Sequence, residues 1–486
     1  MKAIQLLYAE NIIVRHEGSA HQHLMFSMAV QHLAVEKLVE VYWAGEDGVW
    51  RILPAEYRSS IGQQREIWCA EAFFSLAVED VPLPGDIQFA LHYRTAGKDC
   101  WDNNGGYNYA INADSGGRIG DDFPVLNIDF QPALRPGQQY YPITVAVRHS
   151  LRPKQVYVQW TRDHWRETQT SACFFRRKHW DKLLGSNARN PNRYDCGIWI
   201  THLNVGDAFR VEYAIGCETA GGTLWDNNLS ANYLARRERL KILTLNLHCY
   251  QEENQSSKFA QVAKAINDLN ADIVCLQEVG ELWNHGSGDW HSNAGRIIKD
   301  QLAQPYHHQG DWSHLGFQKY MEGCAILSKY PFVFHDSGYV SPVRDVHDIH
   351  SRKVVMAQVD VPYMGFVNVF SVHLSWWNAG FREQLENLMG WAEQRHSGPV
   401  VATFLCGDFN NAVGSEGYRL AAERYEDQFL RANAAGLVSD HDQRIDYIFM
   451  KKGNHLKAVT ARMLFTESDY GRVSDHPGVY AEFEPA

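Results

Sequence analysis

The sequence predicts three domains, two all-β sandwiches followed by one α/β domain, and three observations support this architecture. A motif is repeated in the first half, because WDNNGGYNY at 101–109 recurs as WDNNLSANY at 225–233. Alternating apolar and polar stretches such as 87–95 and 209–215, separated by turn residues, indicate strands in the same half. In the second half, short β-branched runs alternate with stretches of helical spacing, as in α/β domains.

Each copy of the repeated motif belongs to one module of about a hundred residues. Each is preceded by a tryptophan-bearing strand, at 39–51 and 156–167. We therefore expect one immunoglobulin-like sandwich at 1–120 and a second at 143–236. The segment 121–142 is rich in Gly, Asp and Pro and is predicted to be a linker, whereas the junction to the third domain is very short.

The third domain, 239–486, contains apolar runs that predict strands and two segments with helical spacing, at 256–270 and 381–395. Polar residues follow these runs where the strands should end. One such residue is usually turn chemistry, but an ordered series within one domain favours a site. The series comprises Asn246, Glu278, His373, Asp408, Asn410, Asp446, Asp475 and His476.

Three strings in this series, GDFNN (407–411), RIDYIF (444–449) and SDHP (474–477), carry a specific resemblance. With the upstream residues they make the domain resemble the endonuclease/exonuclease/phosphatase superfamily, which includes deoxyribonuclease I, bacterial sphingomyelinases and inositol polyphosphate 5-phosphatases. The resemblance implies a four-layer α/β sandwich, two sheets face to face with helices outside.

Phosphoester hydrolysis needs a cation, because the negative charge of the phosphate repels nucleophiles and a hard ion such as Mg²⁺ binds oxygen ligands. By this resemblance Glu278, Asn246 and Asp475 hold Mg²⁺, with Mn²⁺ as the alternative, and the nucleophile is water. One and two ions are both compatible with this set.

His476 is the expected general base, since an oriented imidazole accepts a proton near neutral pH. The resemblance makes Asp446 its orienter, Asp408 a residue that positions water or metal, and Asn410 a donor to a phosphoryl oxygen. It gives His373 one of two roles, stabilising the phosphate or protonating the leaving alkoxide.

Four further residues are expected to contact the substrate. Arg352 matches a phosphate-facing arginine of the deoxyribonuclease-like pattern, although an exposed surface role is equally compatible. Directly after His373, the residues Trp376, Trp377 and Asn378 are candidates for stacking on a sugar and binding its hydroxyls. Two adjacent tryptophans of an extended strand cannot both point inward, so one is expected to be core.

The repeated motif resembles the starch- and glycogen-binding module of fungal amylases and of glycogen-targeting subunits of protein phosphatase 1. Aromatic rings pack on the C–H faces of sugars, and amides pair with hydroxyls. The resemblance thus predicts glucan contacts in one or both modules, with structural roles as the alternative, for Trp101, Asn104, Asn108, Tyr109, Trp225, Asn228, Asn232 and Tyr233.

Composition bears on partners and location. Over 239–486 there are 22 Lys and Arg against 30 Asp and Glu, a net of −8, so no nucleic-acid partner is expected. No apolar stretch is long enough to span a membrane, and the first residues lack the pattern of a secretory signal. Nine cysteines without a CxxC pair favour a reducing cytoplasm. The oligomeric state stays open.

Together these features predict a Mg²⁺-dependent phosphatase that hydrolyses a phosphomonoester on a phosphorylated α-glucoside such as maltose 6′-phosphate. The third domain is most similar to the bacterial maltose 6′-phosphate phosphatases of the superfamily, above all in HLSWWNAGF (373–381). Two alternatives remain, a phosphodiesterase of nuclease or sphingomyelinase type and a non-catalytic scaffold associated with glycogen.

Overall fold

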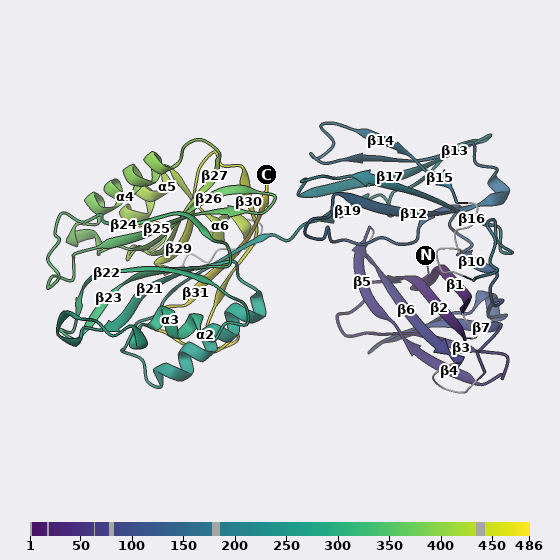
Figure 1. Cartoon of the computed structure of the whole chain (residues 1–486), viewed down its shortest axis with the longest axis horizontal. Helices are drawn as coiled ribbons and strands as arrows, with labels where there is room; N and C mark the ends of the chain where they lie inside the picture. Colours follow the sequence, from purple (N-terminus) through teal and green to yellow (C-terminus); the bar gives the residue numbers. More distant parts are fainter. Residues whose placement is uncertain (1, 17–18, 63, 77–81, 177–184, 434–442) are drawn as a thin grey trace. The chain divides into compact units, whose positions relative to one another are not determined.

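A computed structural model describes residues 2–16, 19–62, 64–76, 82–176, 185–433 and 443–486 (Figure 1). The chain divides into two compact units, Met1–Glu238 and Arg239–Ala486. The elements described in the N-terminal unit are strands and short 3₁₀ turns, and the C-terminal unit combines sheets with helices. Among the described residues, no helix has the length and apolar character needed to cross a membrane. All nine cysteines are free thiols.

The first sandwich of the N-terminal unit is built from two antiparallel sheets with the orders β10-β1-β2-β6-β5 and β4-β3-β7-β8, and β9 pairs with β7. Phe26, Trp43 and Phe89 are buried in the core between them. The strands are β1 (Ile4–His16), β2 (Ser19–Gln31), β3 (Leu38–Ala44), β4 (Trp50–Pro54), β5 (Glu56–Ile61), β6 (Arg65–Ser75), β7 (Ile87–Thr95), β8 (Lys98–Asp102), β9 (Tyr109–Ile111) and β10 (Gly116–Ile119).

The second sandwich has the sheet orders β11-β12-β16-β15 and β14-β13-β17-β18, and β19 pairs with β17. Its strands are β11 (Val125–Asn127), β12 (Tyr140–Arg148), β13 (Gln155–Thr161), β14 (Gln169–Ala172), β15 (Phe174–Phe175), β16 (Cys196–Asn204), β17 (Arg210–Thr219), β18 (Gly222–Asp226) and β19 (Tyr233–Arg236).

The segment 121–142, expected to be a linker, contributes to this second sandwich. Its apolar residues drive this packing, since β11 pairs with β12 and Leu134 is buried in the core. A further cluster that includes Tyr8, Ile119 and Ile198 joins the first sandwich to the second.

The C-terminal unit contains two six-stranded sheets with the orders β22-β23-β21-β20-β31-β30 and β24-β25-β26-β27-β29-β28. Their facing sides form one core, α2 and α3 pack on the outer face of the first sheet, and α4 and α5 pack on that of the second.

The strands of this unit are β20 (Leu240–Asn246), β21 (Ile273–Leu282), β22 (His307–Gly316), β23 (Tyr320–Ser328), β24 (Phe332–Tyr339), β25 (Lys353–Val361), β26 (Gly365–His373), β27 (Val400–Asp408), β28 (Tyr425–Asp427), β29 (Asp446–Lys451), β30 (Leu456–Leu464) and β31 (Gly478–Pro485). Its α-helices are α2 (Gln255–Leu269), α3 (Ala294–Lys299), α4 (Phe381–Arg395), α5 (Glu416–Ala422) and α6 (Gln428–Ala432).

Candidate active site

Three neighbouring strands align three of the predicted residues in one row. In the parallel pair β26 and β27, His373 lies opposite Asp408, and in the antiparallel pair β27 and β29, Asp408 lies opposite Asp446. All three side chains are buried. Because β-branched and aromatic residues fix the register of these strands, the polar residues at their ends are held side by side.

His476 and Asp446 form the closest polar pair of the site. His476 Nδ1 lies 2.6 Å from Asp446 Oδ2, and His476 Nε2 lies 3.9 Å from Asp408 Oδ2. Burial lowers the pKa of His476, but the hydrogen bond to Asp446 and the nearby carboxylate charges outweigh it and raise that pKa to about 9. Since an ionised carboxylate only accepts, the proton of neutral His476 is on Nδ1 and its lone pair is on Nε2.

His373 has the opposite arrangement. The Arg352 guanidinium, which can only donate, places Nη1 3.2 Å from His373 Nδ1, whereas the Asn410 amide nitrogen lies 3.4 Å from Nε2. The closer and charged donor decides the tautomer, so neutral His373 carries its proton on Nε2. That Nε2 faces Asp408 Oδ2 at 3.6 Å and Glu278 Oε1 at 3.9 Å. Burial and the charge of Arg352 hold the pKa of His373 well below its usual range. His373 is therefore a neutral hydrogen-bond donor.

Arg352, predicted to face the phosphate or to lie on the surface, is instead 4% exposed and lies behind His373. Its Nε also lies 3.4 Å from Ser375 Oγ. The strand start that seemed to expose this arginine is covered, and its guanidinium fixes the tautomer of His373.

Glu278 and Asn246 lie beside the row of three residues. Asn246 Nδ2 donates to Glu278 Oε1 at 2.9 Å and to Asp408 Oδ2 at 3.1 Å, while its Oδ1 accepts from His248 N at 3.0 Å. The predicted role of the Asn246 oxygen as a metal ligand does not fit this geometry, because the amide nitrogen faces the two carboxylates. Asn246 orients both of them.

The donor set fits a divalent cation. Glu278, His373 and Asp408 form a group whose candidate ligand atoms lie within 4.8 Å of one another, and because His373 Nε2 carries its proton, the two carboxylates are the ligands. Burial, followed by the charge of Glu322 for Glu278 and of Asp446 for Asp408, raises the pKa of both carboxyl groups. Buried, crowded carboxylates of this kind are hard oxygen ligands whose mutual repulsion a cation would relieve.

Asp475, predicted to complete the metal site, lies beside His476, with its Oδ1 3.9 Å from His476 Nε2, and it also borders a second acidic group. Its Oδ1 lies 3.5 Å from His248 Nδ1, and the same nitrogen lies 2.8 Å from Glu252 Oε1. Sequence reasoning missed His248 and Glu252 as members of the site. His248 stands two residues after Asn246 in LTLNLH, so the strand-end rule that found Asn246 would have found it.

Several residues of the site have strained backbone. Glu278, Asn410 and His248 have positive φ angles of 49°, 49° and 47°. Glu278 sits at a register shift of β21 against β23, which turns its side chain toward the site. Asn410 N donates to Asp408 Oδ1 at 2.7 Å, and Asn410 Nδ2 donates to Leu374 O at 2.9 Å. Such outliers persist where the surrounding structure fixes them, as at functional sites.

The two tryptophans after His373 lie beyond the end of β26, and Trp377 begins a 3₁₀ turn (Trp377–Ala379), so the alternation expected of an extended strand does not apply to them. Trp376 is 52% exposed, whereas Trp377 is half-buried against Phe381, with the Arg382 guanidinium over its ring. Asn378 is exposed. Trp376 and Asn378 are therefore accessible to a ligand, and Trp377 mainly supports α4.

The two WDNN motifs fold in the same way. Asn104 Nδ2 donates to Asn108 O and Asn228 Nδ2 donates to Asn232 O, both at 2.9 Å. The hydroxyls of the buried Tyr109 and Tyr233 donate to Asp102 and Asp226. These hydrogen bonds hold the motif loops against the sandwiches. Tyr109 and Tyr233, predicted to contact glucan, are instead buried and have structural roles.

The tryptophans of the motifs remain accessible. Trp101 is 48% exposed, stacks on His92 and meets Tyr42 edge-on, and Trp225 is 44% exposed with Tyr157 edge-on to it. Exposed aromatic pairs on one sheet face are the surface that packs against sugar rings.

Comparison with known proteins agrees with this description. Residues 243–476 match the endonuclease/exonuclease/phosphatase family, and residues 138–236 match the carbohydrate/starch-binding module of family 21. The chain is similar to the uncharacterized protein YbhP of Escherichia coli K12, with 28% identity over 255 residues, covering 50% of this chain and 95% of that protein.

Two further similar proteins each match only part of this chain. Protein phosphatase 1 regulatory subunit 3E of Mus musculus is 35% identical over 105 residues, 22% of this chain and 37% of that protein. A solved endonuclease/exonuclease/phosphatase family protein from Leptotrichia buccalis C-1013-b is 25% identical with a TM-score of 0.45, covering 50% of this chain and 99% of that one.

Fold and site thus define a hydrolase-type α/β domain in a chain with two all-β sandwiches, of which the second matches a carbohydrate-binding module. The chain carries a domain of the endonuclease/exonuclease/phosphatase family, whose members hydrolyse phosphoester bonds and generally use divalent metals, and a family 21 carbohydrate/starch-binding module ahead of it.

Proposed function

We propose that this protein is a cytoplasmic, Mg²⁺-dependent phosphatase that hydrolyses the phosphomonoester of a phosphorylated α-glucoside such as maltose 6′-phosphate. One observation carries the proposal: the His476–Asp446 pair lies beside the buried Asp408 carboxylate, which shares the Asn246 amide with the half-buried Glu278 carboxylate, on a chain that also matches a starch-binding module. The first feature supports hydrolysis, and the second supports a glucoside as substrate.

The residues divide the chemistry among them. The neutral form of His476, which predominates above its pKa of about 9, accepts a proton from water at Nε2, and the water oxygen attacks phosphorus while the bond to the sugar oxygen breaks. His373 Nε2–H and Asn410 Nδ2, whose two nitrogens lie 3.4 Å apart, would donate to phosphoryl oxygens. Glu278 and Asp408 would hold the cation, which neutralises the charge of the phosphate.

The geometry favours one of the two roles expected of His373. A neutral imidazole with its proton on Nε2 stabilises the phosphate by a hydrogen bond but is a poor acid, because Arg352 occupies Nδ1 and opposes a second proton. Protonation of the sugar alkoxide is then left to water or to His476 once it carries the proton.

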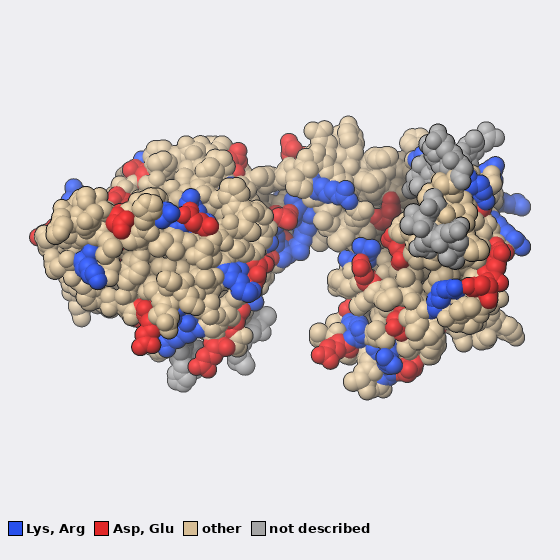
Figure 2. All heavy atoms as spheres, turned by 60° about the horizontal axis from the view of Figure 1, so that its bottom comes forward, with Lys and Arg blue, Asp and Glu red and all other residues tan. Residues whose placement is uncertain are grey.

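Charge argues against a nucleic-acid substrate. The C-terminal unit has a net charge of −8 from 22 basic and 30 acidic residues. On the face drawn in Figure 2, acidic and basic side chains are interspersed over this unit. Affinity for a phosphate backbone comes from gathered basic residues.

The test is phosphate release with Mg²⁺ from maltose 6′-phosphate, compared with glucose 6-phosphate, inositol phosphates, a phosphodiester and plasmid DNA. We expect a strong preference for maltose 6′-phosphate that is lost in His476→Ala. Preferential cleavage of the diester or of DNA would refute the phosphatase proposal and establish a phosphodiesterase. Absence of hydrolysis of every substrate would favour a scaffold.

A further inference from the structure

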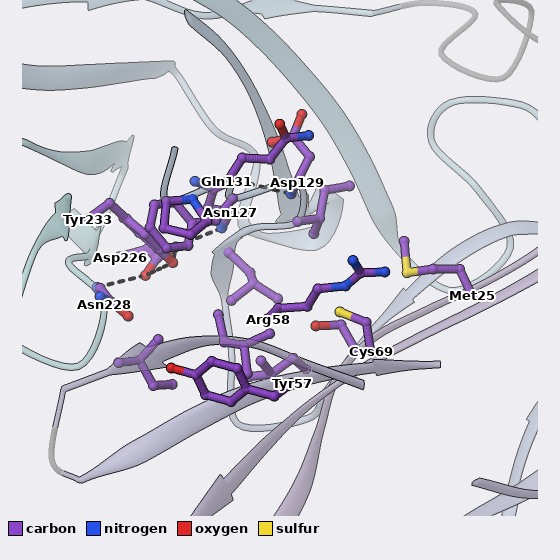
Figure 3. Close-up of a pocket in the computed structure, with 18 of the residues that line it drawn as sticks. Met25, Tyr57, Arg58, Cys69, Asn127, Asp129, Gln131, Asp226, Asn228 and Tyr233 are labelled. Carbon is purple, nitrogen blue, oxygen red and sulfur yellow. Dashed lines mark hydrogen bonds between the residues drawn. The ribbon is translucent and has the colours of Figure 1, made fainter. Parts of the chain in front are cut away.

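A large pocket lies within the N-terminal unit, between its two sandwiches (Figure 3). Its volume is about 670 Å³, within the roughly 300–1,000 Å³ typical of small-molecule sites. Tyr57 and Arg58 of β5 lie on one side, and Asn127, Gln131 and Asn228 lie on the other. Neither Trp101 nor Trp225 lines it, so it is separate from the exposed tryptophan surfaces.

The charged residues that line the pocket have both signs, with Arg58 and Arg135 against Glu71, Asp129 and Asp226, so no excess of positive charge faces a ligand. Arg58 lies 3.6 Å from a Glu71 oxygen and 3.9 Å from a Glu56 oxygen, beyond hydrogen-bond length. The Asp129 carboxylate already accepts from the Thr144 amide and hydroxyl. A guanidinium compensated in this way attracts no net anion, but its N–H groups can still donate to a neutral ligand.

The apolar part of the pocket complements these groups. The Tyr57 ring is 51% exposed, and its hydroxyl lies 2.8 Å from Ser60 Oγ. Met25 and Phe130 add apolar surface to the lining. A ligand that fits has apolar C–H faces for the rings and neighbouring hydroxyls for the guanidinium, the Glu71 carboxylate and the Gln131 amide. A sugar combines these features.

We infer that this pocket binds a short neutral oligosaccharide, of di- to trisaccharide size, independently of the exposed tryptophans. The pocket lies between two sandwiches and so suits a small ligand. The exposed surfaces around Trp101 and Trp225 are open and suit a polymer. The inference does not depend on the reaction of the C-terminal unit.

The second WDNN loop forms part of the wall, which links the pocket to the module surface. Asp226, Asn228 and Tyr233 line the pocket. At its edge Gly62 packs so closely that an added Cβ would lie 2.4 Å from Leu229 O and 2.7 Å from Asn228 O. A ligand here therefore contacts the loop directly after Trp225 and both sandwiches at once.

The experiment is calorimetric titration of the full chain with maltotriose. Trp101→Ala/Trp225→Ala removes the exposed tryptophans of the two motifs, and with Trp376→Ala added to remove an exposed tryptophan of the C-terminal unit we expect one binding site per chain. Adding Arg58→Ala should weaken binding at least tenfold, and Gln131→Ala should weaken it measurably. Adding Arg94→Ala, an exposed arginine of β7 outside the pocket, should leave it unchanged.

Circular dichroism melts of each variant establish that it is folded, and Gln131→Ala, which alters an exposed side chain, provides the test should Arg58→Ala not fold. Absence of maltotriose binding by the wild-type chain, or its loss in the folded triple tryptophan variant, would overturn the inference. Equal affinity with and without Arg58→Ala or Gln131→Ala would overturn it as well.

Discussion

Replacing Asp446 by Asn isolates the carboxylate that controls His476. The two side chains have the same shape, so the Asn oxygen still accepts from His476 Nδ1, which lies 2.6 Å from the carboxylate in the wild type. Only the negative charge is lost. Asp446 Oδ1 is buried and has no hydrogen-bond partner among the described residues, so the substitution breaks no second hydrogen bond.

The magnitude follows from the pKa of His476, which is raised from 6.5 to about 9 in the wild type. An opposite charge at this distance shifts a pKa by about 1–3 units, so in Asp446→Asn we expect His476 to titrate about 2 units lower. A raised histidine pKa stabilises the fold below pH 6.5, and this stabilisation is lost as pH rises toward 9. At about 1.36 kcal/mol per pKa unit, the rise from 6.5 to about 9 stabilises the fold by about 3 kcal/mol.

The assay is NMR titration of metal-free protein labelled at histidine Cε1, with His476→Ala to assign the signal, followed by urea unfolding at pH 6 and pH 9. Asp360→Asn is the matched control, because Asp360 is an exposed carboxylate on β25 of the same sheet. We expect it to leave the titration unchanged. A wild-type His476 that titrates near 6.5, or one that Asp446→Asn does not shift, would refute this reasoning.

Other substitutions test other parts of the C-terminal unit. Arg352→Met should lower phosphate release about 100-fold by freeing His373, measured as kcat with the fold checked by circular dichroism, and unchanged kcat would count against the tautomer assignment. Burial lowers the pKa of His308 to about 4, so between pH 6.5 and 4 the unfolded chain binds a proton that the folded chain does not. The free energy of unfolding should therefore fall by about 3 kcal/mol over this range, and in His308→Leu it should lose this pH dependence. Gly407→Ala should destabilise by about 3 kcal/mol or more in urea unfolding, because φ is 146° and its Cβ would lie 1.9 Å from Val372 O.

Much of the site can be predicted from the sequence, because a change from apolar to polar residues marks the end of each strand. His373, Asp408 and Asp446 were found in this way, and pairing then fixes them in one row. What a sequence lacks is the partner of each polar atom. Whether Asn246 offers its oxygen or nitrogen, and whether Arg352 faces the solvent or His373, depends on strands that are distant in the chain.

The fold shows the same division. The central strands have long apolar runs that predict them, whereas edge strands such as β22 and β24 have almost no buried apolar residues and show no clear period. The repeated motif indicates two sandwiches, but its Tyr residues are compatible with ligand contacts or with loop anchors. Their hydrogen bonds decide for the anchors.

The opposite tautomers of His476 and His373 give the two imidazoles different chemical roles. His476 receives a carboxylate at Nδ1 and offers a lone pair at Nε2, whereas His373 receives a guanidinium at Nδ1 and offers a proton at Nε2. One imidazole is thus prepared to accept a proton and the other to donate a hydrogen bond to developing negative charge, and both lie within 4 Å of Asp408. Exchanging the charges behind the rings would reverse both roles, so Asp446 and Arg352 matter to the chemistry although neither faces the substrate.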